Sequence, residues 1–144
     1  MSAEPTPEQP CPVDGTPMRR DVRPLEIAYK GRALTVEMPG WYCDACGESV
    51  HDADDMKASD RALNRLKAEA DGLLRPEDVR RIRKRLGLTQ RDAGRVIGGG
   101  PSAFQKYESG ELLTSRALSN LLRILERHPE ELRTIRDTAP DQAA

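Results

Sequence analysis

The 144-residue sequence predicts an α+β protein, with a small antiparallel sheet at the N-terminus and an all-α domain of five helices after it. Three observations carry this prediction. Residues 18–38 alternate apolar and polar side chains around a Lys-Gly-Arg turn, which is typical of a β-hairpin. Residues 75–137 repeat apolar side chains at helical spacing. Cysteine-bearing turns flank the hairpin, and a sheet of this size needs such a staple to be stable.

The totals exclude some classes of protein. No apolar run is long enough to cross a membrane, and the start lacks the basic segment and apolar core of a signal peptide, so we expect a cytoplasmic protein with reduced cysteines. The net charge of -1 hides an asymmetry, because residues 1–74 carry -5 and residues 75–136 carry +6. The basic half favours a nucleic-acid partner.

Composition divides the chain into five segments. Residues 1–10, rich in Pro and Glu, predict a disordered lead-in, and residues 11–52 contain the hairpin and the cysteines. Residues 53–74 predict a helical linker that ends at Gly72 and packs only lightly on the N-terminal unit, with Met56, Leu63, Leu66 and Ala70 on one face. Residues 75–137 form the helical domain, and residues 138–144 a flexible tail.

The hairpin places Leu25, Ile27 and Tyr29 on one strand and Leu34, Val36 and Met38 on the returning one, with Met18–Val22 as a possible further strand. Cys43 and Cys46 form a Cys-x-x-Cys-Gly knuckle, in which two intervening residues let a tight turn aim both sulfurs at one ion. The first knuckle begins at Cys11, and Asp14 stands where its second cysteine is expected. Three thiolates and one carboxylate make a plausible structural zinc site, so the predicted metal ligands are Cys11, Asp14, Cys43 and Cys46.

Other interpretations of these residues stay open. His51 is an alternative fourth ligand, and the unit could also persist without metal, held by packing. Cys43 and Cys46 could form a redox pair, which is the enzyme-class alternative. Thiol exchange needs a low-pKa thiolate, and the acidic neighbours Asp44 and Glu48 work against one. No hydrolytic set of side chains occurs, so we expect a protein that is not an enzyme.

The first helix of the C-terminal domain opens with Arg75-Pro76-Glu77-Asp78, and its acids in the first turn suit the helix dipole. Its apolar stripe is Val79, Ile82 and Leu86, and Gly87 ends it. Later, Ser115 caps a helix bearing four leucines, and Pro129 starts a last helix after His128. These leucines (Leu118, Leu121, Leu122 and Leu125) exceed what one small unit must bury, which suggests a homodimer.

Between these helices lies a helix-turn-helix pattern. Thr89 caps a short helix, with Asp92 three residues later, and Ala93, Val96 and Ile97 supply its apolar face. Gly98-Gly99-Gly100 breaks this helix, and Pro101 is expected in the first turn of the next one. Phe104 and Tyr107 face the first helix, which leaves polar positions outward.

The outward positions predict the contacts with double-stranded DNA. The helix from Pro101 would enter the major groove, with Ser102 and Lys106 against base edges, while Gln90 would hold a phosphate. The predicted DNA-binding residues are Gln90, Arg91, Pro101, Ser102, Ala103, Gln105 and Lys106. Further candidates for phosphate contacts are Arg80, Arg81, Lys84 and Arg95.

The order of these motifs along residues 11–136 resembles that of the MqsA-type antitoxins of bacterial toxin–antitoxin pairs. The resemblance is carried by the two knuckles around a hairpin, Leu88-Thr89-Gln90, the glycine turn, Phe104-x-x-Tyr107-Glu108-x-Gly110, and His128-Pro129-Glu130. It implies a structural zinc, a ribonuclease toxin bound by the N-terminal domain, and a C-terminal dimer that binds a palindrome in the operon's own promoter. The alternative is a stand-alone transcription regulator whose N-terminal domain senses a metal or another ligand.

Two departures from the family pattern matter. Asp14 matches a family cysteine that serves as a zinc ligand. Ser102 and Lys106 match an Asn and an Arg that read bases in the family. The operator sequence therefore does not carry over to this chain.

Overall fold

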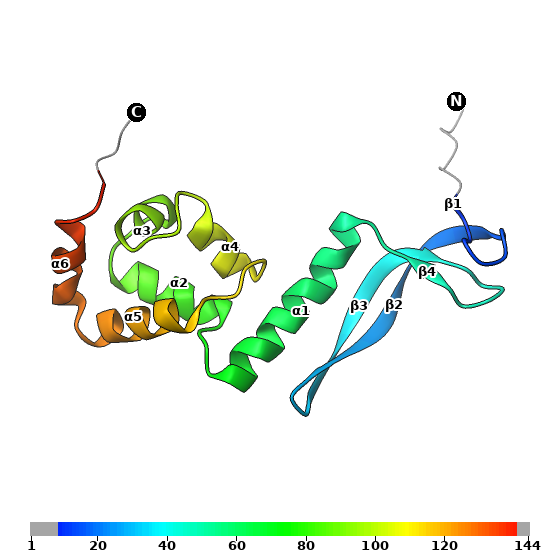
Figure 1. Cartoon of the computed structure of the whole chain (residues 1–144), viewed down its shortest axis with the longest axis horizontal. Helices are drawn as coiled ribbons and strands as arrows, with labels where there is room; N and C mark the ends of the chain where they lie inside the picture. The colour runs from blue at the N-terminus through cyan, green and yellow to red at the C-terminus, as the bar shows by residue number, and fades with distance from the viewer. Residues whose placement is uncertain (1–8, 141–144) are drawn as a thin grey trace.

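A computed structural model describes residues 9–140 and shows the expected α+β architecture, with a four-stranded antiparallel sheet followed by helices (Figure 1). The strands are β1 (Gln9–Pro10), β2 (Pro17–Tyr29), β3 (Arg32–Tyr42) and β4 (Ser49–Val50), in that spatial order. The helices are α1 (Ala53–Asp71), α2 (Pro76–Arg85), α3 (Gln90–Val96), α4 (Ala103–Ser109), α5 (Arg116–Arg127) and α6 (Leu132–Arg136), with a 3₁₀ turn η1 (Pro129–Glu131) before α6. Five helices follow α1, as the sequence predicts.

The β2–β3 hairpin dominates the sheet. Its register pairs Leu25 with Val36 and Tyr29 with Arg32, so the predicted hairpin is confirmed. The expected extra strand at Met18–Val22 is instead the first part of a continuous β2. The turn is only Lys30-Gly31, both with positive φ (48° and 78°), which matches the twist of the strands, so Arg32 belongs to β3.

Two prolines lie inside the hairpin strands without breaking the ladder. The pair Tyr29–Arg32 closes a two-residue turn and is therefore hydrogen-bonded, and hydrogen-bonded and non-bonded pairs alternate from there. Pro24 opposite Glu37 and Pro39 opposite Val22 fall on the non-bonded pairs. Each proline's missing N–H thus faces away from the partner strand, where it costs no ladder bond.

Helix α1 joins the sheet to the helical domain and packs more closely than the linker we expected. Its N-terminus has a reciprocal capping box between Asp52 and Asp55, and Gly72 ends it in the left-handed conformation. Leu66 is buried as predicted, but Met56 is 42% exposed, and the other buried apolar positions are Ala62 and Ala68. Met56 was misassigned because the inward face of this first turn is filled by an ion pair rather than by an apolar residue.

That ion pair joins α1 to β2. Both terminal nitrogens of Arg20 donate to the two carboxylate oxygens of Asp55 at 2.9 and 2.8 Å, and the Asp55 side chain is 5% exposed. At the other end of α1, Tyr29 at the end of β2 and Lys30 of the hairpin turn donate to Asp71 at 2.9 and 2.6 Å. The hairpin and α1 are thus fastened at both ends and form one unit.

The helical domain surrounds one core. Val79, Ile82, Phe104, Leu122 and Leu125 are its largest fully buried side chains. The predicted caps are present, because Thr89 accepts from the Asp92 N–H at 3.1 Å and Ser115 from the Leu118 N–H at 3.0 Å. The apolar spacing read from the sequence therefore identifies this core.

The glycine turn brings α3 and α4 together. All three glycines have positive φ, and a Cβ on Gly94 of α3 would lie 1.8 Å from the Gly100 carbonyl oxygen. The expectation that Pro101 lies in the first turn of the second helix is wrong, because α4 begins at Ala103 with Ser102 as its N-cap. The Ala103 N–H donates to the Gly100 carbonyl at 3.3 Å, so Pro101 and Ser102 form a tight turn ahead of the helix.

The ends of the described chain are ordered further than expected. Gln9 and Pro10 pair with Met18 and Pro17, so this part of the predicted lead-in is a strand, while residues 1–8 lie outside the described residues. Of the predicted tail, Ala139 packs on the core and the Pro140 carbonyl accepts from Arg95, while residues 141–144 lie outside the described range. Within residues 9–140 no helix has the length and apolarity needed to cross a bilayer.

Candidate metal centre and candidate nucleic-acid interface

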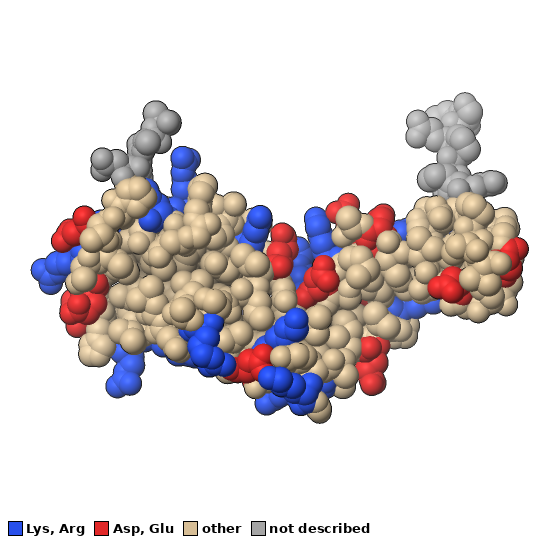
Figure 2. Space-filling view, viewed as in Figure 1, with Lys and Arg blue, Asp and Glu red and all other residues tan. Residues whose placement is uncertain are grey.

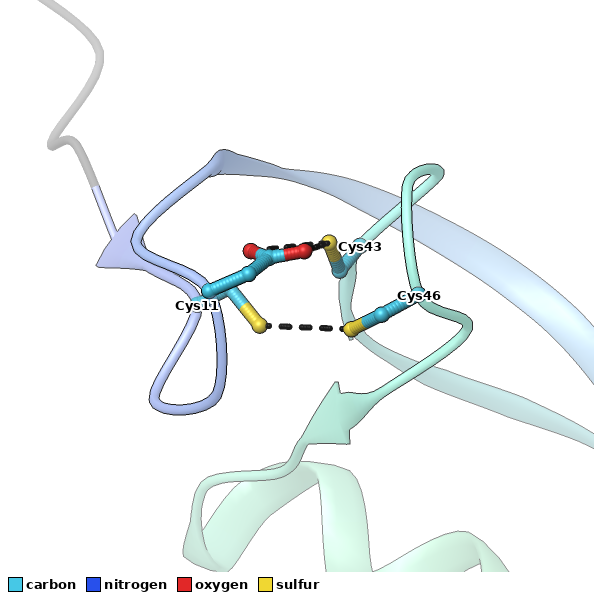
Figure 3. Close-up of side chains that lie close together, drawn as sticks. Cys11, Cys43 and Cys46 are labelled. Carbon is cyan, nitrogen blue, oxygen red and sulfur yellow. Dashed lines mark hydrogen bonds between the residues drawn. The ribbon is translucent and has the colours of Figure 1, made fainter.

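The four predicted metal ligands lie together at the end of the sheet opposite the Lys30-Gly31 turn (Figure 3). Their ligand atoms all lie within 4.8 Å of one another. The sulfurs of Cys11 and Cys46 are 3.5 Å apart, and the Cys43 sulfur is 3.7 Å from each carboxylate oxygen of Asp14. Tetrahedral ligands at ordinary zinc distances are separated by roughly 3.5–3.8 Å, so this donor set fits a zinc ion.

Two turns of the same design present these ligands. The first runs from Cys11 to Thr16 between β1 and β2, and the second from Cys43 to Glu48 between β3 and β4. In each turn the cysteine carbonyl accepts from the N–H of a glycine with positive φ, Gly15 (76°) or Gly47 (79°), at 2.9 Å. Asp14 occupies in the first turn the place that Cys46 holds in the second, which explains why a carboxylate there still points at the cluster.

The pKa values of the clustered side chains suit the binding of a cation. The Thr16 backbone N–H lowers the pKa of the Asp14 carboxyl to about 2, so this group is ionised at neutral pH. The Cys46 and Ala45 amides lower the pKa of the Cys43 thiol. The Glu48 amide also lowers the pKa of Cys46, but burial and the nearby Cys11, Cys43 and Asp14 outweigh it and raise that pKa to about 12. A divalent cation would offset the repulsion among these groups. The raised pKa of Cys46 disfavours the thiolate that thiol exchange needs.

His51 lies outside the cluster. Its Nδ1 is 2.8 Å from the Pro39 carbonyl and its Nε2 is 3.1 Å from the Ser49 hydroxyl, so both ring nitrogens have protein partners. The ring also meets Tyr42 edge-on and fills the space above Gly40. His51 is therefore part of the packing of β3 and β4, and the alternative that made it a ligand is not supported.

The apolar core beside the cluster is small. It comprises Cys11, Met18 and Cys43, with Trp41 and Val50 packed against them. Two of its three buried members are candidate ligands, so packing without a metal leaves little to hold the two turns together. This arrangement favours a structural role for a bound ion.

The predicted DNA-binding residues divide into exposed and buried positions. Ser102, Gln105, Lys106 and Arg91 are exposed, and the Ser102 hydroxyl forms no capping bond to α4. Ala103 is only 6% exposed and lies against Gly99, so its side chain faces the interior and not the outer face of α4.

A surface hollow of about 610 Å³ lies between α2, α3 and α4. It brings together Gln90 and Gln105, two of the predicted residues, and Arg80, which we expected near phosphate. Sequence reasoning missed its other lining residues, Arg83, Thr89, Glu108 and Ser109. Arg83 lies one helical turn after Val79 on α2, so the two side chains share a helix face. Because Val79 was expected to face the core, this spacing could have indicated that Arg83 also points toward the other helices.

The basic side chains predicted to contact DNA differ in their partners. Arg81 is held by Glu126 and Asp78, which raise its pKa, and Arg95 donates to the Pro140 carbonyl. Among the basic residues predicted to contact DNA, four have no carboxylate at ion-pair distance within residues 9–140: Arg80, Lys84, Arg91 and Lys106. Figure 2 shows Lys and Arg at several separate points on the helical half rather than in one continuous patch.

Comparison with known proteins agrees with this arrangement. Residues 9–136 match the family model described as the antitoxin component of the bacterial toxin–antitoxin system, MqsA. The chain is also 32% identical over 129 residues to the antitoxin MqsA of Escherichia coli strain K12, an alignment that covers 88% of this chain and 98% of that protein. The match therefore includes both the candidate metal ligands and the α3–α4 segment. The chain belongs to the MqsA family of antitoxins.

Proposed function

We propose that this antitoxin is also the repressor of its own operon. The helical domain binds a palindromic DNA operator as a homodimer, and the N-terminal sheet binds a cognate ribonuclease toxin. The chain acts by binding, in the cytoplasm, and not as an enzyme. The domain assignment follows: residues 11–52 for the toxin, 53–74 as connection, and 75–137 for DNA and dimerisation.

The exposed polar face of α4 is the observation that carries the DNA-binding proposal. Ser102, Gln105 and Lys106 project from a short helix that Phe104 anchors in the core, and the hollow beside it contains Gln90 and Arg80. An exposed second helix with phosphate-binding groups beside it is the arrangement that enters the major groove.

Salt dependence tests this interaction. With roughly four to eight phosphate contacts per dimer, the affinity for duplex DNA from the region upstream of the gene falls steeply with salt, by about 0.9 log units per contact for each tenfold increase. Fluorescence anisotropy over a fourfold range of salt measures this slope. Affinity that stays constant over that range contradicts the proposal.

A second copy of the chain is the proposed occupant of an apolar hollow of about 450 Å³ next to the glycine turn. Tyr107, Leu113, Leu118 and Leu121 line it, together with Leu112, which is 45% exposed. Because the hollow adjoins α4, a dimer built here places two recognition helices in a fixed relation, as a palindrome requires. In sedimentation experiments, Leu112→Asp should be a monomer. Val22→Asp is the control, because Val22 is also exposed but lies in the N-terminal sheet, and this variant should sediment like wild type.

Zinc is the proposed ion of the metal cluster, held by Cys11, Asp14, Cys43 and Cys46. Its chemistry there is structural, because four protein ligands leave no open position for substrate. The thiolates and the carboxylate tie the β1–β2 and β3–β4 turns together, and this keeps the toxin-binding sheet folded.

Toxin binding by the N-terminal unit is supported by family membership and by charge. Residues 1–74 carry a net charge of -5, which would speed association with a basic toxin. Co-expression with the small basic protein of the adjacent gene should give a stable complex. If the adjacent genes encode no such protein, the metal cluster favours the alternative of a stand-alone regulator with a metal-sensing domain.

A further inference from the structure

Helix α1 contacts the C-terminal end of the recognition helix α4 directly. The side-chain amide of Asn64 donates to the carbonyl oxygens of Gly110 at 2.9 Å and Glu111 at 3.3 Å. Gly110 is the buried C-cap of α4, with φ of 85°. One turn earlier on α1, Arg61 pairs with Glu111 at 3.3 Å, and its Cγ would lie 3.5 Å from a Cβ on Gly110.

These contacts bear on the position of Lys106. Helix α4 has only seven residues, and so short a helix is set by its surroundings rather than by its own hydrogen bonds. The Leu112 N–H donates to the Lys106 carbonyl at 3.2 Å, which closes a loop over residues 106–112. Both carbonyls that Asn64 contacts lie within this loop. A shift of Asn64 therefore displaces the turn of α4 that carries Lys106.

Helix α1 is itself fixed to the helical domain at other points. Arg65 donates to Glu77 at the start of α2 at 3.0 Å. Arg116 and Arg123 of α5 donate to the carbonyls of Asp71 and Gly72, at 2.6 and 2.5 Å, where α1 ends. In Figure 1, α1 lies between the sheet and the helical domain. Asn64 thus sits on an element shared by both halves of the chain.

We propose that Asn64 is a positioning residue for DNA recognition. It holds the C-terminal end of α4 in the orientation that presents Lys106 to the major groove, and so makes the DNA-reading surface depend on a helix of the N-terminal unit. This role rests on the DNA-binding function proposed above. Asn64 itself touches no DNA.

The experiment compares full-length variants of one side chain. Asn64→Ala removes the amide, Asn64→Asp keeps its shape but cannot donate, and Asn64→Gln keeps the donor on a longer side chain. Lys57→Ala is the matched control, because Lys57 is on the same helix and, among residues 9–140, its one ion pair is with Asp54 in the first turn of α1. Affinity for duplex DNA from upstream of the gene is measured well below the Tm, and amide hydrogen exchange of Gly110 and Leu112 is measured without DNA.

Asn64→Ala should bind the duplex about 2- to 10-fold more weakly, the range expected for one lost hydrogen bond. Exchange at Gly110 and Leu112 should be faster than in wild type. Asn64→Asp should lose at least as much, because its carboxylate faces two carbonyl oxygens, and Asn64→Gln should recover part of the affinity. Lys57→Ala should match wild type in both measurements.

Wild-type affinity and exchange in Asn64→Ala and Asn64→Asp would overturn the positioning role and leave the DNA-binding function standing. A wild-type chain that does not bind duplex DNA would overturn the function itself, and this role with it. Faster exchange without loss of affinity would also overturn the role, because the contact would then support α4 without affecting recognition.

Discussion

Arg83 of α2 and Glu108 of α4 form an ion pair, with Nε and Nη2 of the arginine 2.8 and 2.9 Å from the two carboxylate oxygens. The two side chains are only 12% and 6% exposed. Arg83 also donates to the Leu88 carbonyl at 2.9 Å, so one guanidinium joins α2, the α2–α3 connection and α4. The pair also lines the hollow that Gln90 and Gln105 line.

Removing one partner of this pair should be costly. Glu108→Ala leaves a nearly buried guanidinium without its carboxylate, a change that typically costs about 3–5 kcal/mol in the free energy of unfolding. Urea denaturation measures the loss. Arg19→Ala is the control, because its pair with Asp44 is exposed and should contribute little. If the two variants lost equal free energy of unfolding, burial would not be the reason for the strength of the Arg83–Glu108 pair.

Acid should weaken the protein through Asp55. Hydrogen bonds from Arg20 hold the pKa of this carboxyl well below its usual range. The unfolded state therefore takes up the proton first, so the stabilisation is complete above about pH 4 and is lost as pH falls toward the folded pKa. At Asp78, burial raises the pKa, but Arg75 and Arg81 outweigh it and lower it to about 2, which adds to the same loss.

Asp55→Asn should therefore be less stable than wild type at pH 7, by about 1–3 kcal/mol, because Arg20 loses its charged acceptor. The difference between the two proteins should shrink below about pH 4. Urea unfolding of the two proteins across this pH range measures both, and metal release at low pH affects them alike because they have the same candidate metal ligands. A constant difference at all pH values would show that Asp55 does not act through its charge.

Metal affinity should follow the residue at position 14. Asp14→Cys should bind zinc more tightly, because thiolate is a softer donor than carboxylate, and Asp14→Ala should bind it more weakly. Competition with a chromophoric chelator measures both changes. His51→Ala should keep the wild-type zinc content, and a loss there equal to that of Asp14→Ala would show that the ligand set is wrong.

Lys106 and Arg91 should affect DNA binding differently. Lys106→Ala should relax sequence preference and cost about 1–3 kcal/mol on the preferred site. Arg91→Ala should weaken all sequences alike and reduce the salt slope by about 1. Binding of a randomised duplex pool by each variant distinguishes the two. Unchanged selection by Lys106→Ala would remove α4 as the recognition helix.

The close approach of Gly94 to Gly100 should make Gly94 irreplaceable. A Cβ at Gly94 would lie 1.8 Å from a backbone oxygen, so Gly94→Ala must move α3 away from the glycine turn. The cost should exceed the about 1–3 kcal/mol usual for overpacking. Gly87→Ala is a control without such a contact, and only its positive φ (71°) is unfavourable for alanine. Thermal unfolding of the two variants compares them.

The sequence predicts most of the local structure because short-range signals determine it. Thr89, Ser115 and the glycine turn define helix ends, and the alternation around Lys30-Gly31 defines the hairpin. The proximity of Cys11, Asp14, Cys43 and Cys46 was equally predictable, because two turns with the same residue spacing present these side chains. Asp14 could be assigned because it falls at the repeated position of the same turn.

Contacts between distant segments were not predictable in this way. Arg20–Asp55, Arg83–Glu108 and Asn64–Gly110 join residues 25 to 46 positions apart, and a single polar residue gives no sign of which distant partner it will meet. Ala103 was placed on the outer face of α4 because only Phe104 and Tyr107 were expected to face inward. Gly99 of the glycine turn lies against Ala103, and this contact buries its side chain.

The outward positions of Pro24 and Pro39 have a consequence for self-association. Strands β1 and β4 pair only with the ends of the hairpin near the metal cluster, so most of each long edge has no strand beside it within the described chain. An extended chain that approached either edge would meet a missing donor partway along, which makes the edge a poor template for amyloid-like stacking. Two residues that leave the native ladder intact thus protect an exposed hairpin from aggregation.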